Sequence, residues 1–266
     1  MIRQSTSAEV HDLEVRIYTQ VLPKLSVKTP SFLVAFDLGT ECPNWMVLEK
    51  LDGEEASGGT RTERRRILET LARLHLEGIV LERSGQLADA NLPRFDAEAA
   101  RYQKWRSILV DGIADGSYSL LPWIPSCLDA VLAALPGFPY GLIHSDLDLS
   151  NIIVAGNGTI GLIDWEKACI GPISVDLGQF MEHVASGDEL QGYCRQLVVS
   201  QGLRVSEDDV SYWADVGRAF KLIHEICSYV HASLKGRAPA PSWRGKYFEP
   251  CLPALEAIAK RNRWCD

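Results

Sequence analysis

The side chains that could do chemistry are concentrated in one segment of this 266-residue chain, between His144 and Asp176. Asp146 supplies a carboxylate that can orient a hydroxyl group and accept its proton. Asn151 and Asp164 supply a carboxamide and a second carboxylate, and such oxygen ligands suit a divalent cation held against phosphates. This set of groups meets the chemical needs of phosphoryl transfer to an alcohol.

The spacing of these residues is specific. His144, Asp146 and Asn151 fit the pattern H-x-D-L-x-x-x-N, which is typical of the catalytic loop of protein kinases. Asp164 follows the apolar run 160–163, at the point where the kinase plan has a Mg²⁺-binding aspartate. Two short patterns in the right order therefore point to the same reaction.

Several of these residues also have an ordinary structural interpretation. Taken alone, Asp146 and Asp148 would be turn residues, because aspartate is common in turns. Asp148 is interpreted as a turn residue or as a support of the site. Glu166 could lie near a metal, but an exposed carboxylate at a helix start is the favoured interpretation. Trp165 is interpreted as a packing residue.

Longer stretches of the sequence resemble a known family. LIHSDLDLSNIIV, GLIDWEKACIGPISVDLGQF and LARLH at 71–75 are similar to the aminoglycoside phosphotransferase and choline kinase-like group of small-molecule kinases. Weaker similarity extends to WMVLEKLDG, and the resemblance covers residues 10–235. It implies an α+β, protein kinase-like two-lobe fold. The reduced N-terminal lobe and hinge would span 1–53, and the mainly helical C-terminal lobe 54–266.

The resemblance implies a role for each residue of the motif. Asp146 would be the catalytic base, and Asn151 and Asp164 would be the Mg²⁺ ligands. His144 would brace the catalytic loop from within. Asp176 would hydrogen-bond the backbone of that loop and keep its shape. The implied cofactors are ATP or GTP and Mg²⁺.

The nucleotide site is implied to lie nearer the N-terminus. The backbone of Glu49, Lys50 and Leu51 would contact the nucleotide base. Glu14 would pair with a phosphate-binding lysine, although a solvated residue on an amphipathic helix is an equal alternative. Arg3 stands where that lysine is expected, and arginine and lysine are not interchangeable at such a site.

The front of the chain departs from the family pattern. Kinases of this group begin with a glycine-rich hairpin over the phosphates, and no glycine precedes Gly39 here. Three interpretations remain open: the true start lies upstream, the enzyme works without this loop, or the protein is no longer a kinase. The last would make it a pseudokinase or binding module, or an enzyme of another reaction on a phosphorylated substrate.

The acceptor is expected to be a small molecule that is cationic or sugar-like, such as an aminoglycoside. The chain has 35 acidic and 27 basic residues, a net charge of -8. Acidic charge near a cleft would favour a cationic ligand. The helical region 176–231 is expected to build the acceptor pocket. Its candidate wall residues are Glu182, His183, Asp188 and Glu189.

Composition excludes several other classes of protein. With 46% hydrophobic and 23% charged residues, the chain is an ordinary globular protein. The acidic excess argues against a nucleic-acid partner. There is no apolar run long enough for a membrane span and no secretory signal. Seven cysteines without a C-x-x-C pair favour reduced thiols and a cytoplasmic location. A homodimer is compatible with these features.

The periodicity of apolar residues predicts the elements that must position the site. Helices are expected at 6–22 with Ser7 as N-cap, at 60–78 with a stop at Gly78, and at 96–115, 119–135, 176–200, 206–234 and 246–261. Strands are expected at 31–36 and 45–51, a linker at 52–59, and short β-runs with turns at 142–168.

Two further patterns carry less weight. The letters G-x-G-x-x-G occur at 156–161, but no helix follows them, and Asn157-Gly158 favours a hairpin turn over a phosphate cradle. His224 and His231 share a helix face, and a buried polar pair is favoured over a metal site.

Overall fold

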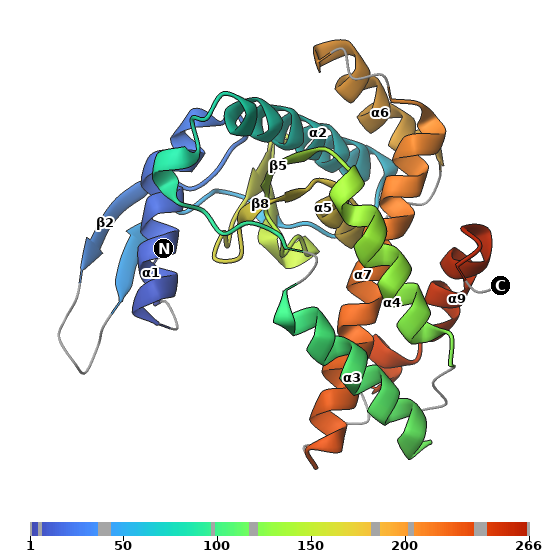
Figure 1. Cartoon of the computed structure of the whole chain (residues 1–266). Helices are drawn as coiled ribbons and strands as arrows, with labels where there is room; N and C mark the ends of the chain where they lie inside the picture. Colours follow the sequence, from blue (N-terminus) through green and yellow to red (C-terminus); the bar gives the residue numbers. More distant parts are fainter. Residues whose placement is uncertain are drawn as a thin grey trace.

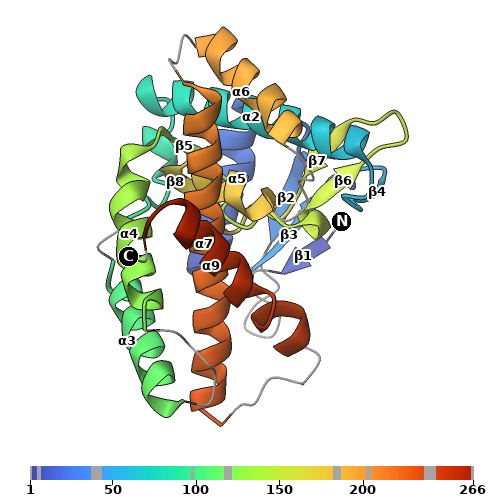
Figure 2. The same cartoon turned by 90° about the vertical axis from the view of Figure 1, so that its right-hand side faces the viewer.

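The structure, a computed structural model, describes residues 2–4, 7–36, 44–96, 99–116, 122–181, 187–201, 205–236 and 244–264. It confirms the mixed α+β organisation (Figures 1 and 2). A group of strands lies with helix α1 at one end of the molecule. Long helices make up the other end, and helix α2 runs across the upper part of Figure 1, below α6.

The N-terminal strands form one antiparallel sheet with the order β1-β3-β2. Strands β2 (Phe32–Phe36) and β3 (Trp45–Leu48) are the predicted strand pair, although β3 ends at Leu48 rather than at residue 51. Strand β1 (Ile2–Gln4) was not predicted. It adds to the free edge of β3, where Arg3 is opposite Met46.

Helix α1 (Ala8–Arg16) begins at the predicted cap, where the Ser7 hydroxyl accepts a hydrogen bond from the Val10 N–H at 3.3 Å. Helical turns continue through Ile17–Val21 and Leu22–Lys24. Leu13 and Val15 of α1 are half-buried against the core, and Ile17 and Val21 of the following turns are buried in it. Glu14 is wholly buried as well, so the interpretation of Glu14 as a solvated residue is wrong.

A second sheet has the order β4-β6-β7. Strands β6 (Ile152–Val154) and β7 (Ile160–Leu162) form the predicted hairpin. The Gly158 N–H donates to the Ala155 carbonyl at 2.7 Å, and Gly158 has a positive φ of 81° that glycine adopts without strain. The predicted linker at 52–59 is wrong in part, because β4 (Glu54–Glu55) lies within it and pairs with β6.

Helix α2 (Arg61–Arg83) passes through Gly78, so the predicted stop there is wrong. The glycine serves packing instead. A Cβ atom at Gly78 would lie 2.7 Å from the backbone nitrogen of Leu142 in β5 (Tyr140–Ile143). Strand β5 pairs with β8 (Cys169–Pro172), and the two carry the catalytic segment directly beneath α2.

The remaining helices lie near their predicted positions, except that the segment expected as one helix at 176–200 forms two, α5 and α6. Their bounds are α3 (Ala100–Asp115), α4 (Ile124–Ala134), α5 (Ser174–Phe180), α6 (Gly187–Gln201), α7 (Glu207–Leu234) and α9 (Cys251–Arg261). Helix α7 is the longest of them and contacts the other five (Figure 2).

Helices α5 and α7 touch through their backbones. A Cβ atom at Gly217 of α7 would lie 1.7 Å from the Ser174 carbonyl oxygen, and one at Gly178 of α5 would lie 2.0 Å from the Gly217 carbonyl carbon. No side chain fits between the two helices at this point. This contact fixes α5, which carries Asp176.

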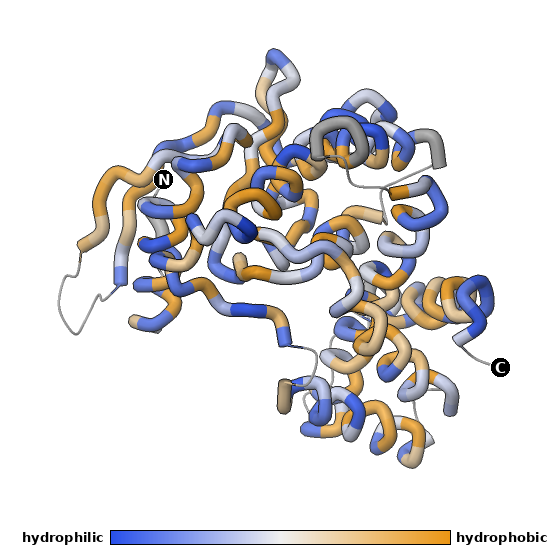
Figure 3. Tube along the Cα trace, turned by 45° about the horizontal axis from the view of Figure 1, so that its top comes forward, coloured by the Kyte–Doolittle hydropathy of each residue, from blue (hydrophilic) through white to orange (hydrophobic). Residues whose placement is uncertain are grey.

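Hydrophobic and hydrophilic positions alternate along the helices, as amphipathic periodicity requires (Figure 3). The apolar positions form one core that runs from the first helix to the last and includes Ile17, Leu71, Phe180 and Leu255. Among the described residues, none of the helices combines the length and apolar character that a membrane crossing needs.

Candidate active site

Asp176 is the centre of a buried hydrogen-bond network. One carboxylate oxygen accepts from the backbone N–H of His144 and the other from that of Ser145, each at 2.7 Å. His75 of α2 places Nε2 3.3 Å from the same carboxylate and Nδ1 2.6 Å from the Tyr193 hydroxyl of α6. The network therefore ties three helices to the start of the catalytic segment.

The surroundings of Asp176 favour its charged form. Burial opposes ionisation, but the hydrogen bond and charge of His75, together with His144, bring the pKa of Asp176 below its usual value. Burial raises the pKa of the Tyr193 hydroxyl well above its usual value, and the charge of Asp176 adds to the effect. Tyr193 is consequently a neutral donor or acceptor in this network.

His144 connects the catalytic segment to the strand that follows it. Its Nε2 lies 2.7 Å from the carbonyl oxygen of Ile163, directly before Asp164, and its ring lies 4.7 Å from that of Trp165. Trp165 is wholly buried and donates from Nε1 to the Leu162 carbonyl. Its predicted role as a packing residue is therefore confirmed.

The three residues proposed to carry the chemistry are joined through this backbone. The Asn151 amide group donates to the Asp146 carbonyl at 2.8 Å, and the Ile163 N–H donates to the Asn151 carbonyl at 3.0 Å. Asp164 follows in a left-handed conformation with φ of 65°, which is rare for a residue with a side chain and directs the chain sharply. The structure thus brings Asp146, Asn151 and Asp164 to one place.

Two residues near Asp146 were missed by sequence reasoning. Lys167 places Nζ 2.7 Å from the Asp146 carboxylate, and both side chains remain partly exposed. Gln179 of α5 accepts from the Leu147 N–H at 2.6 Å and donates to the Ser145 carbonyl at 3.0 Å. No motif marks either residue. Glu166 lies in a turn rather than at a helix start, which corrects the favoured interpretation.

A cavity of about 450 Å³ opens beside Asp146. Helices α5 and α7, which belong to the region expected to build the acceptor pocket, line it, with Gln179, Phe220 and His224 among the contributing residues. The other wall was not predicted and comes from α3 and the segment before it, with Tyr102 and Trp105. His224 therefore faces a cavity. The interpretation of His224 and His231 as a buried polar pair is wrong for His224, whose side chain is open to this cavity.

The residues expected at the nucleotide base lie on a different hollow. Glu49, Lys50 and Leu51 line it together with the β6–β7 hairpin. The Glu49 carboxylate is occupied, because it accepts from the Ser31 hydroxyl at 2.7 Å and pairs with Lys28 at 3.5 Å. These hydrogen bonds from Ser31, followed by the charge of Lys28, lower the pKa of Glu49. The Glu49 backbone N–H is engaged as well, because it donates to the Ser31 carbonyl at 2.8 Å.

Of the four predicted wall residues of the acceptor pocket, only Glu189 has a described side chain. Glu182 and His183 lie outside the described residues, as does the side chain of Asp188. Glu189 is buried and receives Arg64 of α2 at 3.0 Å, so it joins two helices and does not line the cavity beside Asp146.

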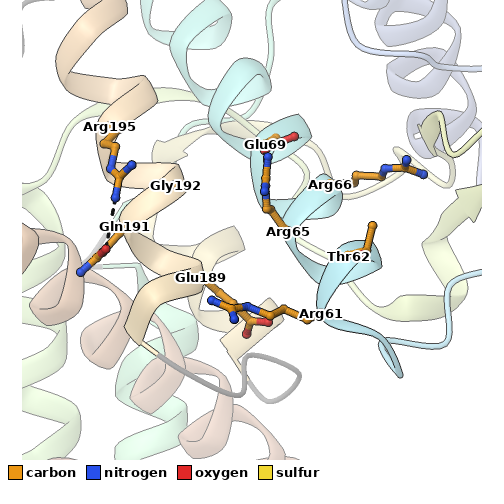
Figure 4. A pocket seen from close by; sticks show the side chains of 9 residues that line it. All are labelled: Arg61, Thr62, Arg65, Arg66, Glu69, Glu189, Gln191, Gly192 and Arg195. Atoms are coloured by element: carbon orange, nitrogen blue, oxygen red, sulfur yellow. Dashed lines mark hydrogen bonds and ion pairs between the residues drawn. The ribbon is translucent and has the colours of Figure 1, made fainter.

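Glu189 instead borders a separate hollow between α2 and α6 (Figure 4). Arginines are frequent there, and neighbouring groups occupy two of them. Arg65 pairs with Glu69, and Arg195 donates to Gln191 at 3.3 Å. This hollow holds none of the residues proposed for catalysis.

Solved structures that resemble this one are phosphotransferases. The GDP complex of aminoglycoside 2'-phosphotransferase-IIIa aligns with a TM-score of 0.66 at 16% identity, over 98% of this chain and 86% of that one. A GDP and kanamycin complex of an APH(2") enzyme aligns at 0.65 with 18% identity, over 98% and 86%. Macrolide 2'-phosphotransferase MphH from Brachybacterium faecium aligns at 0.62 with 17% identity, over 96% and 83%.

The fold is therefore that of the kinase-like phosphotransferases. The sequence model of the phosphotransferase enzyme family matches residues 2–205, which is most of the chain. This protein belongs to that family, and the predicted resemblance to small-molecule kinases is confirmed. No protein of curated function matches it significantly.

Proposed function

We propose that this enzyme transfers the γ-phosphoryl group of ATP or GTP to a hydroxyl group of a small molecule, with Mg²⁺. The proposal rests on the hydrogen bonds that hold Asp146, Asn151 and Asp164 near one another. The Asn151 amide bonds the Asp146 carbonyl, and the N–H of the residue before Asp164 bonds the Asn151 carbonyl. Asp176 fixes the start of the same segment by accepting the His144 N–H. Family membership supports the reaction class. The GDP and kanamycin in the similar structures support a nucleotide donor and a small-molecule acceptor.

The donor groups suit Mg²⁺. A carboxylate on Asp164 and an amide oxygen on Asn151 are the hard ligands that this cation takes, and it keeps its other positions for water and phosphate. The Asn151 amide nitrogen is already engaged by the Asp146 carbonyl, so its oxygen is the atom left for a cation. When bound, Mg²⁺ would offset the charge of the phosphates.

Asp146 would act as the base. The acceptor oxygen attacks the γ-phosphorus, the bond to the oxygen bridging the β- and γ-phosphates breaks, and the nucleoside diphosphate leaves. The hydroxyl proton passes to the Asp146 carboxylate. The cavity of about 450 Å³ is where the acceptor would bind, since Asp146 lies on its wall.

The nucleotide would lie toward the N-terminal strands. We assign the backbone at Glu49, Lys50 and Leu51 to the base, and Arg3 with Glu14 to the phosphate end. Arg3 pairs with Met46 in the sheet that α1 accompanies, which supports this arrangement. We retain residue 53 as the boundary between the two lobes. The five described cysteines carry no disulfide, which supports a cytoplasmic location.

The function is tested with the purified chain, Mg²⁺, ATP or GTP, and a panel of small alcohols. Nucleotide binding is measured by calorimetry, and products heavier by one phosphate are sought by mass spectrometry. Asp146→Asn is expected to lower kcat by roughly 10²- to 10⁴-fold, because general base catalysis contributes about that much. Asp129→Asn, an exposed change on α4, is the control.

Two results would contradict the proposal. If the wild-type chain binds neither nucleotide, phosphoryl transfer fails as its function. If it binds nucleotide but Asp146→Asn and the wild type turn over equally slowly, the protein is a binding module and not a kinase.

A further inference from the structure

An aromatic wall lines the cavity beside Asp146. It consists of Phe95, Tyr102, Trp105, Phe220 and His224. The rings form one continuous cluster: Tyr102 and Trp105 of α3 meet edge to face at 5.1 Å between centroids, and Trp105 stacks on His224 of α7 at 5.1 Å. Tyr102 is buried behind the others, whereas Trp105, Phe220 and His224 keep surface open to the cavity.

Such a wall favours a particular shape of ligand. Aromatic rings stabilise a complex by burying a large apolar area against a flat or apolar partner. A ring that stays exposed to water does not make this contribution to the binding free energy. Aromatic faces also attract cations, so the wall indicates the shape of the ligand and the charged residues around it must indicate its charge. The wall is built by helices far apart in the sequence, so it is a property of the tertiary structure.

The charge of the cavity is also informative. Its described lining carries four cationic residues, Arg94, Arg101, Lys167 and Lys221, and three acidic residues, Asp146, Asp148 and Glu225. The acidic excess of the whole chain, which led to the expectation of a cationic acceptor, is therefore not concentrated here. Because Arg94 is compensated by Glu82, the charges around the cavity are nearly balanced, and the acidic excess that would favour a polycation is absent from its described lining.

Two of these cations are available to a ligand. Arg94 pairs with Glu82 at 2.6 Å, and Lys167 pairs with Asp146. Within the described part of the chain, Arg101 and Lys221 make no ion pair. The Arg101 guanidinium lies 4.8 Å from the centre of the Tyr102 ring, at the edge of the aromatic wall.

The electrostatic effect of these cations is seen at His224. Partial loss of solvent around the imidazole is the main cause that lowers the pKa of His224. The charges of Lys167, Lys221 and Arg101 lower it further, against the opposing effect of Asp146.

We propose that the acceptor is an alcohol with a flat or apolar face and an anionic group, such as a carboxylate or a phosphate. The face would stack on Trp105 and Phe220, the anionic group would reach Arg101 and Lys221, and the hydroxyl would meet Asp146. This inference rests on the proposed kinase function and specifies the substrate class of the same site.

Three alcohols of equal size test the charge preference: 3-(hydroxymethyl)benzoate, its carboxamide and the corresponding benzylamine. Binding to the full chain is measured by calorimetry and phosphorylation by mass spectrometry. The carboxylate is expected to bind at least about tenfold more tightly than the amine, a difference of roughly 1.4 kcal/mol. Equal or tighter binding of the amine overturns the proposal, and so does the absence of binding by all three at about 10 mM.

Two variants locate the effect. Lys221→Gln is expected to remove most of the preference for the carboxylate, and Trp105→Ala to weaken all three ligands about tenfold, as loss of a stacked ring does. Lys221 is partly exposed, so its variant remains informative if Trp105→Ala fails to fold. Arg106→Gln is the matched control, because Arg106 lies next to Trp105 in sequence but pairs with Asp129 outside the cavity.

The proposed substrate class and the proposed kinase function are tested by different measurements. Nucleotide binding by the wild type, measured without any acceptor, tests the kinase function alone. Normal nucleotide binding with a preference for the amine overturns only the substrate class. An unchanged preference in Lys221→Gln also overturns the assignment of the anionic group.

Discussion

Asp176 shows how one side chain can hold a catalytic loop in shape. Its carboxylate accepts two backbone N–H groups, from His144 and Ser145, and faces the ring of His75. All of this takes place out of contact with solvent, where an N–H group without a partner is costly. Replacement by asparagine keeps the shape but removes the charge and turns one acceptor into a donor.

We therefore expect Asp176→Asn to lower the free energy of unfolding by about 3 kcal/mol at pH 7, as loss of a buried charged partner does. The measurement is urea denaturation followed by circular dichroism. Asp111→Asn, an exposed change on α3, should have almost no effect. A variant as stable as the wild type would remove Asp176 from its structural role.

The difference in free energy of unfolding between the wild type and Asp176→Asn should depend on pH, because the pKa of Asp176 is lowered in the folded state. A carboxyl whose pKa is lower in the folded state contributes stability that is complete above its usual pKa, about 3.9. That contribution is lost as the pH falls through the folded value. The gap between wild type and Asp176→Asn should thus stay constant from pH 7 to about 4 and shrink below it. A stability difference that grows as the pH falls would contradict a lowered pKa of Asp176.

Lys167 acts on Asp146 directly, at 2.7 Å. The pair is partly exposed, so it contributes little to stability, but it fixes where the carboxylate points. Lys167→Met should lower kcat about tenfold, equivalent to roughly 1.4 kcal/mol, with little change in melting temperature. Lys167→Arg should retain most of the activity. A rise in kcat in Lys167→Met would mean that the ammonium competes with the acceptor hydroxyl for Asp146.

At the scale of elements, the close approach of α5 and α7 decides where Asp176 lies. The backbone of Gly217 touches that of Ser174, with room for hydrogen atoms only. A methyl group there must separate the two helices. Because α5 carries both Asp176 and Gln179, such a shift would reach the catalytic loop through their hydrogen bonds.

Gly217→Ala is accordingly expected to destabilise the protein by about 3 kcal/mol, the upper range for overpacking, and to lower kcat. Gly192→Ala is the matched control, since nothing lies within 4 Å of a Cβ atom at that helical position. It should stabilise by about 0.5 to 1 kcal/mol, because alanine loses less entropy in a helix. Thermal and urea unfolding measure both changes. Equal effects of the two variants would disprove the packing role of Gly217.

At the scale of the whole molecule, the proposed nucleotide site joins the N-terminal strands to the helical part through the hairpin of β6 and β7. A ligand held by both parts should stabilise the folded state. Nucleotide with Mg²⁺ at 100 times its Kd should add about 2.7 kcal/mol, or roughly 5 °C in melting temperature. EDTA should remove the Mg²⁺-dependent portion of this shift.

Asp164→Asn provides the decisive comparison in the same thermal assay. It is expected to lose the Mg²⁺-dependent portion while keeping the melting temperature of the unliganded protein within a few degrees. An identical Mg²⁺-dependent shift in this variant would exclude Asp164 as a metal ligand.

Much of the organisation could be predicted because it is encoded locally. The strand pair at β2 and β3, the cap at Ser7 and the turn at Gly158 depend on neighbours in the sequence. Predictions failed where a distant element decided the outcome. Gly78 resembles a helix stop, but α2 continues through it because β5 packs against its backbone. Glu14 resembles a surface residue, but the fold buries it.

The sequence by itself indicated the reaction class, since His144, Asp146, Asn151 and Asp164 lie in one short segment with the spacing of a kinase catalytic loop and metal segment. Only the tertiary structure decided what surrounds Asp146. The aromatic wall combines rings of α3 and α7, and the Lys167 ammonium pairs with the Asp146 carboxylate, which precedes it in the chain by two strands. These contacts join residues far apart in the chain, where packing rather than periodicity sets the distance. Local patterns therefore predict the chemistry, and long-range packing shapes the cavity proposed to bind the acceptor.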